Sequence, residues 1–160
     1  MLNFEKKVRI TVDSEKYDNS EALAAPIGVG TDDIKPQHET ISFTTEGTLA
    51  SKTGKVTLSY DDSELFDGEQ TGVSIIFYEN TPELVSMLRG GSVSTAMVFE
   101  SGKRHICVYN TPFMTFEVCI NTTRVLNKLL TNGILELEYS IEVHGVSAEI
   151  TRMKITVVEI

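Results

Sequence analysis

Residues 84–120 read LVSMLRGGSVSTAMVFESGKRHICVYNTPFMTFEVCI, and this stretch decides the fold. Three turn sequences divide it into four segments in which apolar and polar residues alternate: Gly90-Gly91, Ser101-Gly102 and Asn110-Thr111-Pro112. Alternation with a period of two is typical of a β-strand with one buried face. Glycine supplies the positive φ that a two-residue hairpin turn needs, and proline has no N–H to give to a ladder. The stretch therefore predicts four antiparallel strands joined by hairpins.

The turn lengths predict a register for these strands. Two-residue turns set Leu88 opposite Val93 in the first hairpin and Glu100 opposite Lys103, as an ion pair, in the second. Because a slip of one residue would turn a strand over, the agreement of the three turns favours one apolar face. This face comprises Leu84, Leu88, Val93, Met97, Phe99, Ile106, Val108, Met114, Phe116, Val118 and Ile120. The opposite face carries an apolar strip of Val85, Ala96, Val98, Cys107 and Tyr109.

The composition indicates one folded domain over residues 1–160. Of the 160 residues 41% are hydrophobic, which is enough for a core, and the net charge is −9. An acidic chain lacks the clustered lysine and arginine that bind phosphate, so we expect neither nucleic acid nor an anionic membrane as a partner. No apolar run approaches the roughly 20 residues of a membrane span, and the first residues show no secretory apolar segment. We therefore expect a cytoplasmic protein.

Residues that carry chemistry are sparse. Cys107 and Cys119 are expected to be free thiols, because in this register they share a face but lie about four residues out of line. A catalytic pair of His105 with Cys119 would need a slipped turn, and the face assignment puts His105 on the exterior, so we expect no catalytic residues. The histidines, His38, His105 and His144, are scattered, so we expect neither a metal site nor a cofactor.

The first half of the chain repeats the strand pattern with one long interruption. Residues 5–13 alternate, and further alternations follow at 41–47, at 56–60 after a turn at Lys52-Thr53-Gly54, and at 73–77. Residues 14–38 break the pattern and contain two prolines and two glycines, which predicts a long loop that is either a surface loop or a lid. The acidic segment 61–69 lacks the ligand spacing of a calcium loop and is interpreted as a solvated turn.

The second half begins with an ambiguous segment. Residues 123–130 fit a short helix or a strand, and we favour a strand because the hairpin signal Asn132-Gly133 follows. Residues 135–143 give the cleanest alternation of the chain, and Gly145 turns them into a last strand around 153–157. The outward arginine and lysine of that strand are expected to sit across from outward glutamates. For the apolar sets of both strands to share a face, the loop needs an odd residue count or a bulge.

These segments predict about ten short strands joined by nearest-neighbour hairpins. A single sheet of that length is rarely left open, because its unpaired edges invite aggregation and its twist accumulates. Closure into an all-β, single, up-and-down antiparallel barrel of about 8–10 strands follows, with an apolar interior.

From about Glu39 to Ile160 the order of segments resembles the YwiB-like family of uncharacterised bacterial proteins. The residues that carry the likeness are Leu88-Arg89-Gly90, Met97 to Glu100 before Gly102, Tyr109 with Thr111-Pro112-Phe113, Gly133 with Leu135 to Tyr139, and Ile155 with Glu159. The chain departs from the family pattern at Met114, where a glycine is common, and in the length of segment 14–38. The resemblance implies a calycin-like (lipocalin-like) β-barrel and passes on no mechanism.

Positive charge inside the barrel is the sharpest functional hypothesis. The register puts Arg104 on the inner face, and a strict two-residue Asn132-Gly133 turn would add Arg124 and Lys128. Buried cations in an apolar cavity would mark a site for an anionic amphiphile such as a fatty-acid-like ligand. In the alternative, Arg104 reaches out at its strand end and an odd loop points Lys128 outward against glutamates; cross-strand pairing favours this alternative.

The sequence alone therefore favours a cytosolic, non-enzymatic barrel that binds a small apolar or amphiphilic anionic ligand. The candidate ligand-binding residues are Met97, Phe99, Arg104 as anchor, Ile106, Phe116 and Tyr139. The alternative is a structural or protein-interaction module that acts through its outer face as a homodimer.

Overall fold

The computed structural model describes residues 3–18, 37–61, 71–91, 94–143 and 146–160. The strands are β1 (Phe4–Asp18), β2 (Gln37–Lys52), β3 (Lys55–Asp61), β4 (Gly72–Tyr78), β5 (Thr81–Arg89), β6 (Ser94–Glu100), β7 (Arg104–Asn110), β8 (Thr115–Lys128), β9 (Ile134–Val143) and β10 (Val146–Glu159). Within the described ranges every regular element is a strand. None of these described ranges contains a helix that is long and apolar enough to span a membrane.

The ten strands form one closed sheet. Each strand runs antiparallel to its neighbours in the sequence, and β10 pairs with β1 to complete the ring. The closing ladder extends from Val8 opposite Glu159 to Asp18 opposite Glu149. Closure removes the unpaired edges at which open sheets aggregate. The predicted all-β, up-and-down antiparallel barrel is therefore confirmed.

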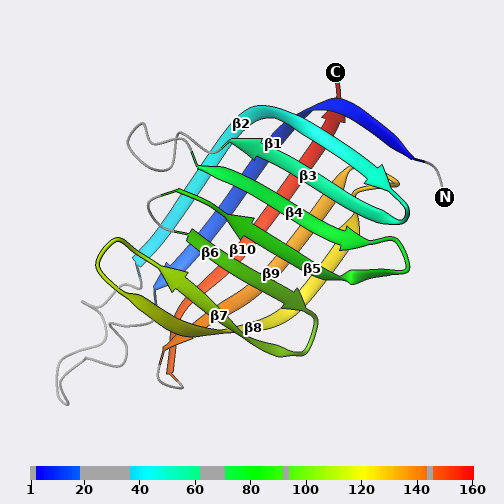
Figure 1. The fold of residues 1–160 in the computed structure, drawn as a ribbon. Helices are drawn as coiled ribbons and strands as arrows, with labels where there is room; N and C mark the ends of the chain where they lie inside the picture. Colours follow the sequence, from blue (N-terminus) through cyan, green and yellow to red (C-terminus); the bar gives the residue numbers. More distant parts are fainter. Residues whose placement is uncertain (1–2, 19–36, 62–70, 92–93, 144–145) are drawn as a thin grey trace, which may run out of the picture.

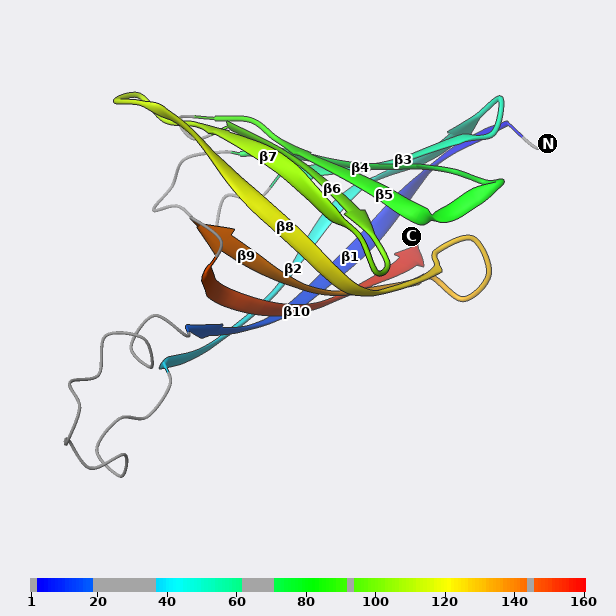
Figure 2. The same cartoon turned by 90° about the horizontal axis from the view of Figure 1, so that it is seen from below.

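The barrel is flattened into two walls. Strands β3 to β7 form one wall, β9, β10 and β1 form the other, and the strands of the two walls cross at a steep angle (Figure 1). Figure 2 shows the walls one above the other, with the long strands β2 and β8 running from one to the other. The ring of Phe99 on β6 lies 4.6 Å from that of Tyr139 on β9. The interior is thus a layer of side chains between two sheets, as in a sandwich.

Alternation selects the buried face wherever only one face of a strand is apolar. The predicted inner residues of β1, β3, β4 and β9 are buried: Val8, Ile10, Val12, Val56, Leu58, Tyr60, Val73, Ile75, Phe77, Leu135, Leu137 and Tyr139. Their polar neighbours in sequence point outward because successive side chains of a strand point to opposite faces. The sequence-based face assignment is correct for these four strands.

The predicted register of the first hairpin is wrong. Met87 pairs with Met97 and Leu88 with Ala96, so the connection between β5 and β6 is longer than the two-residue turn predicted at Gly90-Gly91. The difference from the predicted register is an odd number of residues, which turns β5 over. Leu88 is consequently 44% exposed, whereas Met87 is fully buried. Both faces of β5 carry apolar residues, so alternation does not choose between them.

The second hairpin has the predicted turn, but its strand then shifts by one residue. Lys103 N donates to Glu100 O at 3.0 Å, as expected of a two-residue turn. Further along, Thr95 pairs with Tyr109 instead of Val108. Side chains of β7 are therefore reversed relative to the prediction. Ile106 and Val108 lie outside, and Cys107 and Tyr109 belong to the inner face.

The third hairpin was expected to set Ile106 opposite Phe116, whereas Tyr109 pairs with Phe116 and Cys107 with Val118. Phe116, Val118 and Ile120 keep the predicted inner face, and Met114 is exposed in the turn. The two cysteines lie on opposite faces, since Cys119 pairs with the outward Ile106. Both are free thiols, as predicted.

In the second half most predictions are confirmed. Residues 123–128 belong to β8 and are strand, not helix. The β9–β10 hairpin contains the required bulge, between Ser147 and Glu149. Arg152 faces Glu138 and Lys154 faces Glu136, as the outward pairing predicted. The turn at Asn132-Gly133 is longer than two residues, since Lys128 pairs with Ile134.

The predicted loop at 14–38 is shorter at both ends. β1 extends to Asp18 and β2 starts at Gln37, so residues 14–18 and 37–38 are strand. Tyr17 stacks on His38 with ring centroids 4.6 Å apart, and this stack joins the two strand ends. The predictions for residues 19–36, and for the acidic segment from residue 62, fall outside the described residues.

Candidate functional site

The structure divides the predicted ligand-binding residues into two groups. Met97, Phe99 and Tyr139 are buried in the interior. Phe116 belongs to the inner face at the start of β8 and is partly exposed. The predicted inner placement of Arg104 and Ile106 is wrong. Ile106 is 71% exposed, because of the register shift in β7.

The three predicted interior cations all lie outside. Arg104 has a 66% exposed side chain and pairs with Glu142 at 3.3 Å. Arg124 bridges Glu136 at 3.2 Å and Glu138 at 3.8 Å, because the longer β8–β9 turn sets it opposite Glu138. Lys128 is exposed. The alternative prediction, in which these cations point outward and pair with glutamates across the strands, is the one that the structure shows. The glutamates expected to pair with Lys128 pair with Arg124 instead.

A different arginine belongs to the inner face. Arg89 follows the buried Val85 and Met87 at strand spacing, is half-buried, and pairs with Thr95 across the β5–β6 ladder. The predicted two-residue turn placed it outside. Val85, Met87 and Arg89 alternate along the strand, so they share one face. That pattern would have predicted Arg89 on the inner face if no turn length had been assumed.

Two aromatic contacts line the same part of the interior. Phe99 of β6 packs against Tyr139 of β9. The ring centroids of Tyr109 on β7 and Phe116 on β8 lie 5.4 Å apart. The Tyr109 hydroxyl donates to the sulfur of Met97 at 3.9 Å. Aromatic rings in tilted contact fix one another's orientation. The two phenol groups are thereby held on opposite walls of the barrel.

Burial controls the ionisation of these groups. It raises the pKa of Tyr109 to about 12, with smaller contributions in the same direction from Cys107 and Glu149, while Arg89 acts to lower it. The pKa of Tyr139 is raised first by burial and then by the proximity of Tyr109. Burial likewise raises the pKa of the Cys107 thiol. At neutral pH these groups are protonated donors, not bases or nucleophiles.

These pKa shifts predict a loss of stability in alkali. The unfolded state ionises tyrosine near pH 10, whereas the folded state holds both phenols protonated to higher pH. The stabilisation is complete below pH 10 and is lost as the pH rises towards about 12 for Tyr109. Urea unfolding between pH 8 and pH 11 is expected to show a falling free energy of unfolding, with a smaller slope in Tyr139→Phe. An equal slope in the variant would contradict the burial of this phenol.

Buried hydroxyls accompany the phenols on the inner face. The side-chain oxygens of Ser14, Thr95 and Thr122 are buried and have no hydrogen-bond partner within the described part of the chain. Thr122 pairs with Tyr139 across the β8–β9 ladder, and Thr95 pairs with both Arg89 and Tyr109. A buried hydroxyl without a partner is costly, so such groups are usually satisfied by water or a ligand.

We call Arg89, Thr95, Tyr109, Tyr139 and Glu149 the inner polar cluster. Glu149 lies close enough to raise the pKa of both phenols, and its carboxylate is 3.9 Å from Lys16 Nζ. Arg89, Thr95, Tyr109 and Glu149 each lie within a few residues of a strand end. These strand ends are at the same end of the barrel, where β5, β7 and β9 end and β6 and β10 begin. The cluster offers donors, one cation and one carboxylate, which suits the binding of a polar group.

Evidence for catalysis or metal binding is lacking in the described ranges. His105 Nε2 lies 3.0 Å from Glu100 Oε1, so its contact is with a carboxylate and not with Cys119. The described residues contain no group of three histidine, cysteine or acidic side chains arranged for a metal ion.

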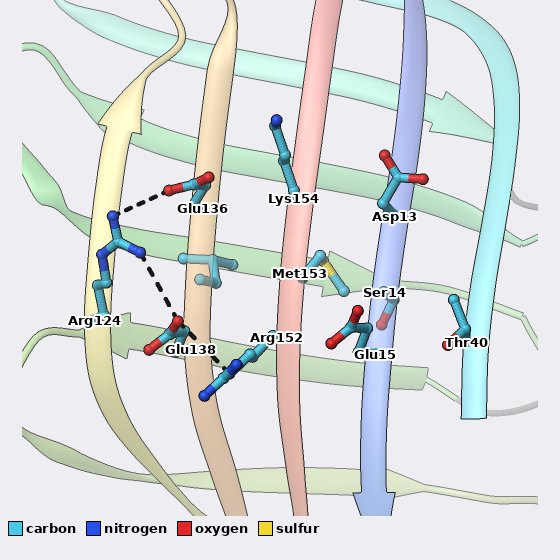
Figure 3. A pocket seen from close by; sticks show the side chains of 11 residues that line it. Asp13, Ser14, Glu15, Thr40, Arg124, Glu136, Glu138, Arg152, Met153 and Lys154 are labelled. Atoms are coloured by element: carbon cyan, nitrogen blue, oxygen red, sulfur yellow. Dashed lines mark ion pairs between the residues drawn. The ribbon is translucent and has the colours of Figure 1, made fainter. Parts of the chain in front are cut away.

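A second candidate is a groove of about 440 Å³ on the outer face of β8, β9, β10, β1 and β2 (Figure 3). Its lining residues are Asp13, Ser14, Glu15, Thr40, Arg124, Glu136, Leu137, Glu138, Arg152, Met153 and Lys154. Charges of opposite sign alternate across neighbouring strands, and Arg152 Nε lies 3.7 Å from Glu138. Because these acids and bases largely neutralise one another, the groove is best explained as a paired surface.

Comparisons with known proteins agree with the fold. A family model described as "Domain of unknown function (DUF1934)" matches residues 29–155. The crystal structure of the ywiB protein from Bacillus subtilis is similar, with a TM-score of 0.73 and 22% identity, over 97% of this chain and 92% of that chain. No curated protein matches the chain. The predicted resemblance to the YwiB-like family is confirmed, and the structural likeness shows the fold alone.

Proposed function

The chain belongs to the DUF1934 family, domains of unknown function, and we propose that its barrel binds a small amphiphilic molecule at the polar end of the interior. The observation that carries the proposal is the gathering of buried polar side chains on the inner face, with hydroxyls of Thr95 and Thr122 that have no partner among the described residues. A core that served stability alone would be expected to carry apolar residues there.

The chemistry of the cluster favours a ligand with a polar or anionic head. Arg89 supplies positive charge, and the phenols of Tyr109 and Tyr139 are donors because their raised pKa keeps them protonated. Met97 and Phe99 next to them give apolar contact for the body of the ligand. Towards the other end the interior is filled by large side chains such as Phe77 and Leu135. The ligand is therefore small and confined to one end.

The same proposal places the protein in the cytoplasm as a non-enzymatic binding protein. The two free thiols support a reducing compartment. Nucleic acid and anionic membranes are not part of the proposed role, since a chain of net charge −9 is repelled by phosphate. A second candidate role is protein association through the outer face, which exposes Leu84, Leu88, Ile106 and Val108. Because these side chains point away from the interior, the two roles do not compete.

Methyl NMR of protein labelled at the methionine methyl groups tests the ligand site. Titration with decanoate, an anionic amphiphile, is expected to shift the Met97 resonance, because Met97 lies beside Tyr109. The resonance of Met114, which is exposed in the β7–β8 turn, is the internal control and is expected to stay in place. Decanol, which has the same tail without charge, is expected to bind more weakly because it does not attract Arg89.

An Arg89→Met variant completes the design. It keeps the length of the side chain and removes its charge, so it is expected to abolish the preference for decanoate over decanol. A titration that leaves Met97 unshifted, or that shifts only Met114, would reject binding at the inner polar cluster.

A further inference from the structure

The ladder between β6 and β7 is incomplete. Each strand has seven residues, but the ladder pairs only Ser94–Ala96 of β6 with Val108–Asn110 of β7. On its other side β6 pairs with β5 over nearly its whole length, and β7 pairs with β8 over all of it. Within the described ranges no other two neighbouring strands share so few residue pairs. The wall of the barrel is therefore least connected between β6 and β7.

Two registers that differ by one residue explain the missing pairs. The hairpin turn sets Glu100 opposite Lys103, since Lys103 N donates to Glu100 O at 3.0 Å. The ladder at the other end of the two strands needs one residue more on β7 than on β6. Residues 97–99 of β6 thus face residues 104–107 of β7, and an extra residue of this kind interrupts ladder pairing. We call these two segments the seam.

Contacts between side chains bridge the seam. Near the turn, His105 Nε2 lies 3.0 Å from Glu100 Oε1, and both side chains are about one third exposed. At the other end the Tyr109 hydroxyl donates to the sulfur of Met97 at 3.9 Å. Water weakens contacts between exposed charged groups, and a thioether sulfur is a weak acceptor. Both contacts can break while β6 stays paired with β5 and β7 with β8.

The seam lies beside the proposed ligand site. Met97 and Phe99 of β6 and Cys107 of β7 belong to the seam, and their side chains are buried in the interior. Tyr109, a member of the inner polar cluster, follows Cys107 at strand spacing. Because these side chains are buried, the seam is closed in this structure. Separation of the two strands would expose the interior next to the cluster.

We propose that β6 and β7 separate along the seam, and that a small molecule enters and leaves the interior through this opening. The inference rests on the proposed function, because it assigns the route to the interior site and not the site itself. Local openings occur where few hydrogen bonds and contacts hold a segment, and they cost less than global unfolding. Every other ladder within the described ranges has more pairs, so the wall separates most easily at the seam.

Amide hydrogen exchange of the full chain without ligand, followed by NMR, tests the opening. Amides of residues 97–99 and 104–107 that point across the seam are expected to exchange at least about tenfold faster than paired amides, because they lack a ladder partner. Amides of the same strands that point into the β5–β6 and β7–β8 ladders are the internal control. Seam amides that exchange as slowly as these controls would overturn the opening.

A reversible cross-link tests the route. Val98 and Ile106 lie on the outer face, and they would face each other if the ladder continued beyond Ala96 and Val108. In a Cys119→Ser background, Val98→Cys and Ile106→Cys are joined by a short reagent that forms a disulfide with each thiol. Decanoate exchange, read from the Met97 methyl resonance, is expected to slow by about tenfold or more. Reduction of the link is expected to restore the rate, which shows that the protein is folded.

The matched control links Ser86→Cys to Val98→Cys in the same background. These two positions pair directly across the β5–β6 ladder, so a link there ties strands that are already joined and is expected to leave the rate unchanged. Unaltered decanoate exchange across the linked seam, or equal slowing by the control link, would overturn the route and leave the interior site standing. A wild type in which decanoate does not shift Met97 would instead reject the interior site, and the route with it.

Discussion

Met87→Asp is expected to prevent folding, whereas Leu88→Asp, one residue further along β5, is expected to fold. Met87 is fully buried and faces Met97 across the β5–β6 ladder, so an aspartate there would be a buried, unpaired charge. The expected loss is several kcal/mol, which is comparable to the whole stability of a small domain. Leu88 is 44% exposed on the outer face of the barrel, and its replacement is expected to cost less than about 1 kcal/mol.

The pair is decisive because the two candidate registers predict opposite outcomes. A two-residue turn at Gly90-Gly91 would bury Leu88 and expose Met87. Circular dichroism and urea unfolding of both variants at neutral pH are sufficient to tell the registers apart. A folded Met87→Asp variant beside an unfolded Leu88→Asp variant would show that β5 has the other face inside.

Phe99→Ala is expected to give the largest loss among truncations of single aromatic residues. Phe99 is fully buried and its ring contacts Tyr139 on the opposite wall, so its removal leaves a cavity between the walls. Truncation of a buried phenylalanine typically costs about 3–5 kcal/mol. The same change exposes Tyr139 and is expected to bring its pKa down towards the ordinary value, because burial is the main cause of its shift.

Phe113→Ala is the matched control, because Phe113 is 96% exposed in the β7–β8 turn. Its free energy of unfolding is expected to stay within about 0.5 kcal/mol of the wild type. Urea unfolding measures both variants, and ultraviolet titration of the phenols follows Tyr139. Equal losses for the two variants would contradict contact between the walls at Phe99.

The strand order and the closure of the barrel were predictable because they depend on turn spacing and on alternation. In β1, β3, β4 and β9 only one face is apolar, so the face that packs inside is unambiguous. The outward pairs of β9 and β10 followed from the same logic, since Arg152 and Lys154 meet Glu138 and Glu136 once the bulge sets the register. Those predictions needed no knowledge of exact turn lengths.

The faces of β5 and β7 were not predictable in this way. Both strands have apolar side chains on each face, as Met87 and Leu88 or Ile106 and Cys107 show. The decision then depends on turn length, and an error of one or three residues reverses the strand.

The candidate site was predicted in part. Met97, Phe99 and Tyr139 lie inside as expected, because the register differences do not turn β6 or β9 over. The predicted interior cation Arg104 lies outside, and the arginine that belongs to the inner face is Arg89. Arg89 was missed because the assumed two-residue turn beside it placed its side chain outside.

The inner polar cluster is proposed to hold a small molecule, and native mass spectrometry of the protein purified from its own host can detect that molecule. The folded wild type is predicted to carry an additional small mass that is released on unfolding. That mass is predicted to be lost in Arg89→Met and retained in Val158→Asp, which alters only an exposed outer position. Bare protein mass in the folded wild type, or an adduct that Arg89→Met retains in full, would contradict the claim.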